Sequence, residues 1–229
     1  MLEFNLSKLC FGCEALGGTD WGDINVQDIE KAINFAVERG INFFDTADVY
    51  GLGLSEKRLS SILGDKRHDM FIATKGGVRW NVTKSKRAEI VFDSSPSYIT
   101  KAVEQSLQRM KLETLPLYYI HWPDQHTFIK ETLDCLNKLK GEGKIKYIGL
   151  SNIKDLELET ALNYSKVDLK ILYLHCLILL LFHLCHNFFL LFVSPIDQLS
   201  TFLVQYQYLT YCLHLKEQLY LLSLLYLQM

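Results

Sequence analysis

The sequence predicts an α/β fold of the (β/α)8-barrel type, with about five to six strand–helix units present. Three observations support this prediction. Short apolar runs alternate with segments of helical period between residues 9 and 153. The runs are short and uniformly apolar, as expected for strands that are covered on both faces of a parallel sheet. No G-x-G-x-x-G motif follows the first run, which disfavours a Rossmann nucleotide-binding domain.

The first two units are predicted within residues 9–63. A strand at 9–12 precedes a helix at 28–39, where apolar residues recur on one helical face: Ile29, Ala32, Ile33, Ala36 and Val37. Asn25 is placed to cap the start of this helix, and Gly40 supplies the left-handed residue that ends it. A second strand is expected at 41–44, followed by a shorter helix at 55–63.

The following units repeat this order. A third strand is predicted at 70–74, and the basic run at 84–87 is interpreted as a solvated loop after it. The next helix opens at Ser95-Pro96, because proline is favoured at the first helical position. A helix from Thr127 to Gly141 separates the strands predicted at 117–120 and 145–150. A fifth helix fits residues 155–164, and a sixth strand is expected to start at 166–168.

The composition changes abruptly after Lys170. Only three of the 50 charged residues follow it, and the last of the 13 glycines is Gly149. We therefore divide the chain into a partial barrel, residues 1–168, and an apolar tail, residues 169–229. The favoured interpretation is that the tail was not selected as part of this fold, as after intron read-through or a frame shift. Residues 171–193 lack Asp, Glu, Lys and Arg and are long enough to span a bilayer, so a membrane helix stays open as an alternative.

Charge and cysteine content limit the classes of partner. A formal net charge of −2 gives no electrostatic reason to expect nucleic acid as a partner. The N-terminus lacks the features of a secretory signal, so the six cysteines are expected to be reduced thiols in a cytoplasmic protein. No metal site is expected, because the possible ligands lack a partner pair or an acidic environment: Cys10 and Cys13, and His183, Cys185 and His186.

Four polar residues follow predicted strands: Asp45 and Tyr50 the second, Lys75 the third and His121 the fourth. The carboxyl ends of barrel strands meet at one rim, where we expect these side chains to gather. A lysinium close to a phenol favours tyrosinate and lowers the tyrosine pKa from about 10. Asp45 would keep Lys75 charged and oriented, and a neutral His121 would donate a hydrogen bond to a carbonyl oxygen. The four residues therefore predict a proton-donating site for carbonyl reduction.

Four motifs in this order resemble those of the aldo-keto reductase family, from about residue 6 to residue 167. Residues 44–51, FDTADVYG, are similar to the signature around the family's catalytic Asp and Tyr. Thr74-Lys75 is similar to the segment with the catalytic lysine, and residues 118–124, YYIHWPD, to the segment with the active-site histidine. Residues 143–152, GKIKYIGLSN, are similar to the fifth-strand segment.

The resemblance implies NADP or NAD as the hydride carrier, with Ser151 and Asn152 holding the nicotinamide amide. It also implies a small-molecule carbonyl or sugar substrate. Trp21, Trp80 and Trp122 follow the first, third and fourth strands, and both a substrate-pocket role and ordinary loop packing stay open for them. Two rival classes also stay open: a non-catalytic binding or regulatory protein, and a membrane-anchored protein that uses residues 171–193.

Overall fold

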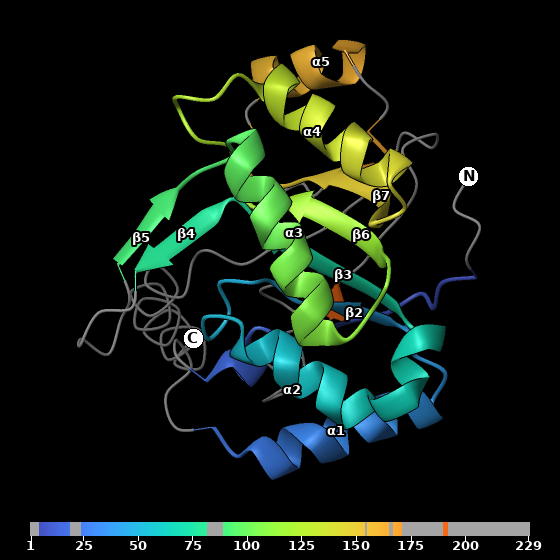
Figure 1. Ribbon diagram of the computed structural model, residues 1–229. Helices are drawn as coiled ribbons and strands as arrows, with labels where there is room; N and C mark the ends of the chain where they lie inside the picture. The colour runs from blue at the N-terminus through green and yellow to red at the C-terminus, as the bar shows by residue number, and fades with distance from the viewer. Residues whose placement is uncertain are drawn as a thin grey trace, which may run out of the picture.

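Figure 1 shows a computed structural model of the chain, in which helices cover one face of a largely parallel sheet. The structure describes residues 5–18, 24–81, 89–153, 155–164, 167–170 and 190–191. The main sheet has the strand order β8-β7-β6-β3-β2-β1-β9. Its parallel strands follow one another across the sheet in chain order, which confirms the predicted barrel-type α/β class.

The five predicted strands are present and pair in parallel: β1 (Cys10–Gly12), β2 (Phe43–Asp45), β3 (Phe71–Gly76), β6 (Leu115–Ile120) and β7 (Ile145–Leu150). The short strand β8 (Leu169–Lys170) adds in parallel to β7, just after the start expected at 166–168. Another short strand, β9 (Leu190–Leu191), pairs antiparallel with β1. This antiparallel pairing is a feature that the sequence pattern does not predict.

A hairpin outside the main sheet follows β3 and was also not predicted. Its strands are β4 (Val78–Asn81) and β5 (Glu89–Phe92), and they project beside α3 in Figure 1. The backbone N–H of Asp93 donates to the carbonyl of Gly77 at 3.0 Å and closes the base of the hairpin. The basic run 84–87, interpreted as a solvated loop, lies outside the described residues.

Five helices lie within two residues of their predicted starts: α1 (Val26–Glu38), α2 (Leu54–Leu63), α3 (Pro96–Met110), α4 (Ile129–Gly141) and α5 (Asp155–Tyr164). The Asn25 side chain accepts from the backbone N–H of Gln27 at 3.0 Å, which confirms the predicted cap of α1. Gly40 has φ 82°, as expected for a residue that ends a helix. Two short 3-10 helices, η1 (Ala15–Gly17) and η2 (Gly64–Asp69), complete the helical elements described.

The two faces of the sheet contribute to separate apolar clusters. The larger cluster lies between the sheet and the helices and includes Phe44, Ile72 and Ile120. The other lies on the opposite face: Cys10, Phe43, Phe71, Ala73, Leu117, Tyr119 and Tyr147. Side chains alternate between the faces of a strand, so Lys75 continues the row of Phe71 and Ala73 on the face away from the helices.

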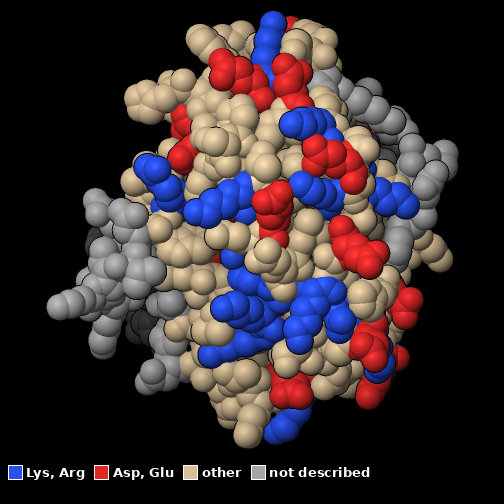
Figure 2. Space-filling view, viewed as in Figure 1, with Lys and Arg blue, Asp and Glu red and all other residues tan. Residues whose placement is uncertain are grey.

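The outer surface of the helical layer carries charge of both signs. Figure 2 shows Lys and Arg side chains gathered over α2 and α3, with acidic side chains around them. Of the helices that the structure describes, none has both the length and the apolar composition needed to cross a bilayer. The run 171–193, considered above as a membrane helix, lies outside the described residues except for β9.

Candidate active site

The carboxyl ends of β2, β3 and β6 bring together the four polar residues predicted for the site. Asp45 is the last residue of β2, Lys75 is the second-to-last residue of β3, and His121 directly follows β6. Tyr50 reaches the same place from the loop between β2 and α2. The side chains are almost withdrawn from solvent, with residue exposures of 4% for Asp45, 0% for Lys75, 8% for Tyr50 and 2% for His121. Electrostatic interactions among them are therefore screened much less than at the surface.

Lys75 is the centre of the group. Its Nζ donates to Asp45 Oδ1 at 2.5 Å and to the backbone carbonyl of Thr46 at 2.8 Å. The Tyr50 hydroxyl lies 3.5 Å from the same nitrogen, within reach of a long hydrogen bond. An ammonium group has three donors, so these three oxygens define its position. The expected approach of phenol and ammonium at the end of the sheet is present.

The loop that carries Tyr50 is attached to the sheet through its backbone. The N–H groups of Thr46 and Asp48 donate to the carbonyls of Ala73 and Lys75 on β3, at 2.9 and 3.0 Å. These bonds extend the pairing of β2 and β3 beyond the last strand residue. The loop therefore turns back over the end of β3, which places the Tyr50 ring next to Lys75.

Two glycines let the loop after β1 contact the Tyr50 loop at backbone distance. Gly51 has φ 59°, in the left-handed region that other residues seldom adopt. A Cβ atom on Gly17 would lie 2.6 Å from the backbone nitrogen of Gly51. Neither position therefore has room for a side chain, and the closeness of these loops fixes the backbone next to Tyr50.

His121 packs against Tyr50 and is neutral. The ring centroids of His121 and Tyr50 are 5.7 Å apart with an interplanar angle of 85°, an edge-to-face contact. Burial, aided by the positive charge of Lys75, lowers the pKa of His121 well below its usual range. A neutral imidazole has one N–H donor and one acceptor nitrogen, as the predicted role requires.

Asp45 balances the charge of Lys75. Burial raises the pKa of Asp45, and the attraction and hydrogen bond of the Lys75 ammonium oppose that shift. Its Oδ1 accepts from Lys75, whereas Oδ2 has no hydrogen-bond partner among the residues described. The pair holds a positive charge beside the phenol in a site shielded from water.

Ser151 and Asn152, predicted to hold a nicotinamide amide, lie beside His121 at the end of β7. The backbone N–H of Ser151 donates to the carbonyl of Ile120 at 3.0 Å. Asn152 adopts φ 54° and donates from Nδ2 to the carbonyl of His121 at 2.7 Å. Both residues are therefore next to the four polar groups, and their cofactor-binding role stays a prediction.

The three tryptophans proposed for a substrate pocket have different outcomes. Trp122 stacks on His121 with ring centroids 4.5 Å apart, so it lies at the site. Trp80 belongs to β4, where it pairs with Ile90 of β5. Trp21 lies outside the described residues. Phe92, which stacks on Trp122 at 5.6 Å, was missed because the hairpin that positions it was not predicted.

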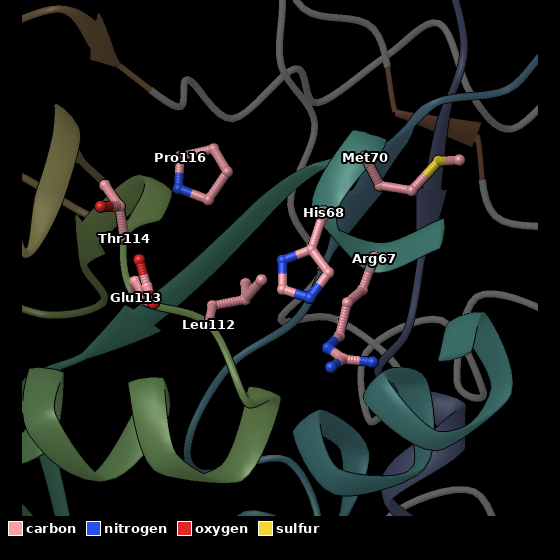
Figure 3. A pocket seen from close by; sticks show the side chains of 7 residues that line it. All are labelled: Arg67, His68, Met70, Leu112, Glu113, Thr114 and Pro116. Carbon is pink, nitrogen blue, oxygen red and sulfur yellow. The ribbon is translucent and has the colours of Figure 1, made fainter. Parts of the chain in front are cut away.

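A cavity of about 360 Å³ lies at the amino-terminal ends of β3 and β6, at the end of the sheet opposite to the four polar residues. Figure 3 shows its lining residues, which come from the segments before β3 and β6 and from the start of β6: Arg67, His68, Met70, Leu112, Glu113, Thr114 and Pro116. Functional groups of barrels lie at the carboxyl ends of the strands, whereas residues at the amino-terminal ends mainly contribute to stability. We therefore locate the candidate site at the buried charged group rather than at this cavity.

Comparisons with known proteins find similar sequences and structures that belong to one family. Residues 8–187 match the family described as "Aldo/keto reductase family", past the boundary at residue 168 that composition predicts. The chain is 40% identical over 149 residues to a probable aldo-keto reductase 1 of Glycine max, covering 65% of this chain and 42% of that protein. It is 33% identical over 178 residues to the NADH-specific methylglyoxal reductase of Escherichia coli, covering 73% and 55%.

Solved structures give the same result. The glycerol dehydrogenase of Gluconobacter oxydans superposes with a TM-score of 0.67 at 35% identity, over 74% of this chain and 53% of that chain. An aldo-keto reductase of Bacillus halodurans, in its holo form, gives 0.66 at 31% identity, over 74% and 54%. The chain thus spans about half the length of the curated relatives and structures that it matches.

Proposed function

The chain belongs to the aldo-keto reductase family, and from this premise we propose that its site reduces aldehydes or ketones, or oxidises an alcohol or sugar in reverse. One observation supports this proposal above the others. The Nζ of Lys75 lies between the Asp45 carboxylate, at 2.5 Å, and the Tyr50 hydroxyl, at 3.5 Å. Such a pair suits proton transfer, because a nearby positive charge stabilises the phenolate that remains after the phenol gives up its proton.

In the proposed reaction Tyr50 donates the proton that the carbonyl oxygen acquires. Lys75 stabilises the resulting phenolate, and Asp45 keeps Lys75 charged and directed toward the phenol. The neutral His121 donates a hydrogen bond that places the carbonyl oxygen near Tyr50. General acid catalysis of this kind contributes about 10²–10⁴-fold to a rate.

We assign the nicotinamide end of NADPH or NADH to the end of β7. When bound, this cofactor supplies the hydride that the carbonyl carbon acquires. The chemistry of the residues fits this group, because a primary amide is recognised by hydroxyl and amide side chains such as those of Ser151 and Asn152. Their position beside His121 supports the assignment, since the hydride and the proton must reach adjacent atoms. One solved relative, from Klebsiella pneumoniae, is described in complex with NADPH and shares the fold at 19% identity.

The proposed substrate class is a small carbonyl or sugar-derived compound. The curated relatives include a 6-dehydroglucose reductase of Novosphingobium aromaticivorans and an L-galactose dehydrogenase of Arabidopsis thaliana. Trp122, and Trp80 on the hairpin, are the aromatic residues that we assign to the substrate pocket. A reducing, cytoplasmic setting suits the site, since Cys10, Cys13 and Cys135 are buried free thiols.

The test is oxidation of NADPH in the presence of a simple aldehyde, with Tyr50→Phe as the decisive variant. Tyr164→Phe is the matched control, because among the residues described its hydroxyl donates to Asp134 at the exposed surface. We expect Tyr50→Phe to lower turnover by about 10²-fold or more and the control to retain it. Undiminished turnover in Tyr50→Phe would reject the proposed acid role.

The same pair of variants is made in a second protein, because the chain spans about half of its relatives. This fusion continues after Asp168 with the remaining part of the Bacillus subtilis aldo-keto reductase YhdN, which is 33% identical over 156 residues. Fluorescence titration of NADPH shows whether each protein binds the cofactor. A loss of turnover with retained binding assigns the effect of Tyr50→Phe to chemistry rather than to folding.

A further inference from the structure

The side chain of Asp124 is buried, with a residue exposure of 8%, and its carboxylate accepts four hydrogen bonds. Its Oδ2 accepts from the backbone N–H and the hydroxyl of Ser94, at 2.6 and 2.7 Å. Its Oδ1 accepts from the backbone N–H groups of His126 and Thr127, at 2.6 and 2.7 Å. Burial alone raises the pKa of Asp124, but the bonds from Ser94, His126 and Thr127 prevail and hold it below its usual range.

These bonds join two segments that are far apart in the chain. His126 and Thr127 belong to the loop that also contains Asp124, whereas Ser94 is 30 residues away, between β5 and α3. The contact is reciprocal, since the backbone N–H of Asp124 donates to the Ser94 hydroxyl at 3.2 Å. Thr132, on α4, donates to the carbonyl of Ser94 at 2.9 Å. A residue that only caps α4 would need the local donors alone, so the bonds to Ser94 require another explanation.

The joined segments carry rings that lead to the candidate site. Phe92 lies two residues before Ser94, and Trp122 lies two residues before Asp124. Their rings stack with centroids 5.6 Å apart and an interplanar angle of 26°. Trp122 stacks in turn on His121, at 4.5 Å and 26°. The His121 ring meets Tyr50 edge-to-face, so four rings form a continuous series from the hairpin to the proposed proton donor.

We propose that Asp124 is a positioning residue, which holds Phe92 against Trp122 and thereby sets the plane of the His121 ring toward Tyr50. The hydrogen bonds between Asp124 and Ser94 fix the distance between the end of β5 and the loop after β6. Without them the hairpin can move away from Trp122, and the His121 ring loses the stack on one of its faces. The catalytic meaning of this role rests on the proposed function, whereas the geometric role does not.

The test compares Asp124→Asn with Asp93→Asn as its matched control. In Asp124→Asn an amide NH₂ replaces one carboxylate oxygen. Because an NH₂ group cannot accept, the two hydrogen bonds that this oxygen received are lost. Asp93 also accepts from a serine, through the backbone and hydroxyl of Ser95 at 3.1 and 2.6 Å. Its other partner is Arg79 on β4, at 3.5 Å, so the Asp93 contacts stay within the hairpin and the segment after it.

Each variant is labelled with 5-fluorotryptophan, and the fluorine resonance of Trp122 is assigned with Trp122→Phe. The imidazole resonances of His121 are recorded on the same proteins. We expect Asp124→Asn to shift or broaden the Trp122 and His121 signals while the protein stays folded, and Asp93→Asn to leave both in place. Unchanged Trp122 and His121 signals in folded Asp124→Asn would overturn the proposal.

Ser94→Ala decides the matter if Asp124→Asn does not fold. It removes the hydroxyl bonds but keeps the bond from the Ser94 N–H, so a smaller shift of the same two signals is expected. Unshifted signals in Ser94→Ala would then overturn the proposal. In a chain or fusion that turns over, we also expect Asp124→Asn to lower kcat by about tenfold to 10²-fold with an unchanged KM for NADPH. Failure of the proposed function would appear instead as undiminished turnover of Tyr50→Phe, with the resonance shifts of Asp124→Asn intact.

Discussion

Adjacent residues of β3 contact two buried ion pairs, one on each face of the sheet. On the helix side the Thr74 hydroxyl donates to Glu56 Oε1 at 2.6 Å, and the Arg109 guanidinium donates to Oε2 of the same carboxylate. On the opposite face Lys75 pairs with Asp45. Glu56 and Lys75 are both 0% exposed, so burial does not distinguish the two pairs.

The two pairs differ in how completely their hydrogen bonds are satisfied. Both oxygens of Glu56 accept, and the Arg109 guanidinium also donates to the Ser106 hydroxyl at 3.0 Å. Asp45 Oδ2 has no hydrogen-bond partner among the described residues, and the third neighbour of Lys75 is the Tyr50 hydroxyl at a longer distance. A saturated pair holds α2 and α3 to the sheet, whereas a pair with spare capacity is typical of a functional site.

Breaking the saturated pair gives the largest expected loss of stability. Arg109→Met keeps much of the side-chain volume but leaves the Glu56 carboxylate buried without its cation. Removing one partner of a buried pair costs about 3–5 kcal/mol of unfolding free energy, measured by urea titration. Lys31→Met is the control, because its pair with Asp28 is exposed on α1 and contributes less than about 1 kcal/mol. Equal losses in the two variants would mean that the Glu56 pair does not stabilise α2 and α3.

Breaking the other pair is expected to affect turnover more than folding. In Lys75→Met the Asp45 carboxyl can take up a proton, since burial already raises its pKa, and so avoids an uncompensated charge. Without the ammonium the Tyr50 phenolate is no longer stabilised, and turnover of NADPH with an aldehyde falls by about 10²-fold or more. Circular dichroism and the aldehyde assay measure the two effects separately. If Lys75→Met lost as much stability as Arg109→Met, the two ion pairs would not differ in their contribution to folding.

The sequence is sufficient to predict the parts of this comparison that depend on local pattern. Asn25 and Gly40 mark the ends of α1 because capping and left-handed backbone are requirements of single residues. Lys75 and His121 each sit at the end of a short apolar run, and the barrel pattern then brings strand ends together. The contact between Lys75 and Tyr50 could therefore be predicted, although its length of 3.5 Å could not.

Contacts between distant segments are the part that the sequence does not predict. Gly17 approaches Gly51, and Ser94 binds Asp124, across gaps that no local pattern spans. The hairpin of β4 and β5 was missed because its strands are four residues each and alternate too briefly to stand out from a polar loop. The signals available were that Val78 and Trp80 are apolar on either side of Arg79, and that Ile90, Val91 and Phe92 form a short apolar run. Asp124 was recognised in a family motif, but nothing in the sequence indicated its partner.

A gentler change on the helix side tests whether saturation of Glu56 matters as much as its charge. Thr74→Val has nearly the same shape and removes only the hydroxyl that donates to Oε1. A hydrogen bond to a charged group contributes about 1.5–3 kcal/mol, so we expect a loss of about 2 kcal/mol in urea titration. Turnover should change little, because Thr74 faces away from Tyr50. Thr160→Val removes a hydroxyl that bonds within α5, and an equal loss there would contradict the special role of Glu56.

The smallest expected effect is a pH dependence on the face of Lys75. His121 is neutral when folded because burial and Lys75 lower its pKa, whereas the unfolded side chain has a pKa of about 6.5. Above this value neither state binds the proton, and stability is unaffected. Below it the unfolded state binds a proton that the folded state excludes, so stability falls as pH falls. Between pH ~7.5 and ~5.5 this costs about 1.4 kcal/mol.

His121→Asn removes this titration. The unfolding free energy of this variant should therefore fall less than that of the wild type as the pH is lowered from ~7.5 to ~5.5. His68→Gln, at an exposed position of η2, is the control and should follow the wild-type curve. Urea titrations of the three proteins at both pH values measure the difference. Parallel curves for the wild type and His121→Asn would show that the imidazole gains a proton in the folded state. A protonated His121 would add a second positive charge beside Lys75, and the site could not then position a carbonyl oxygen with a neutral donor.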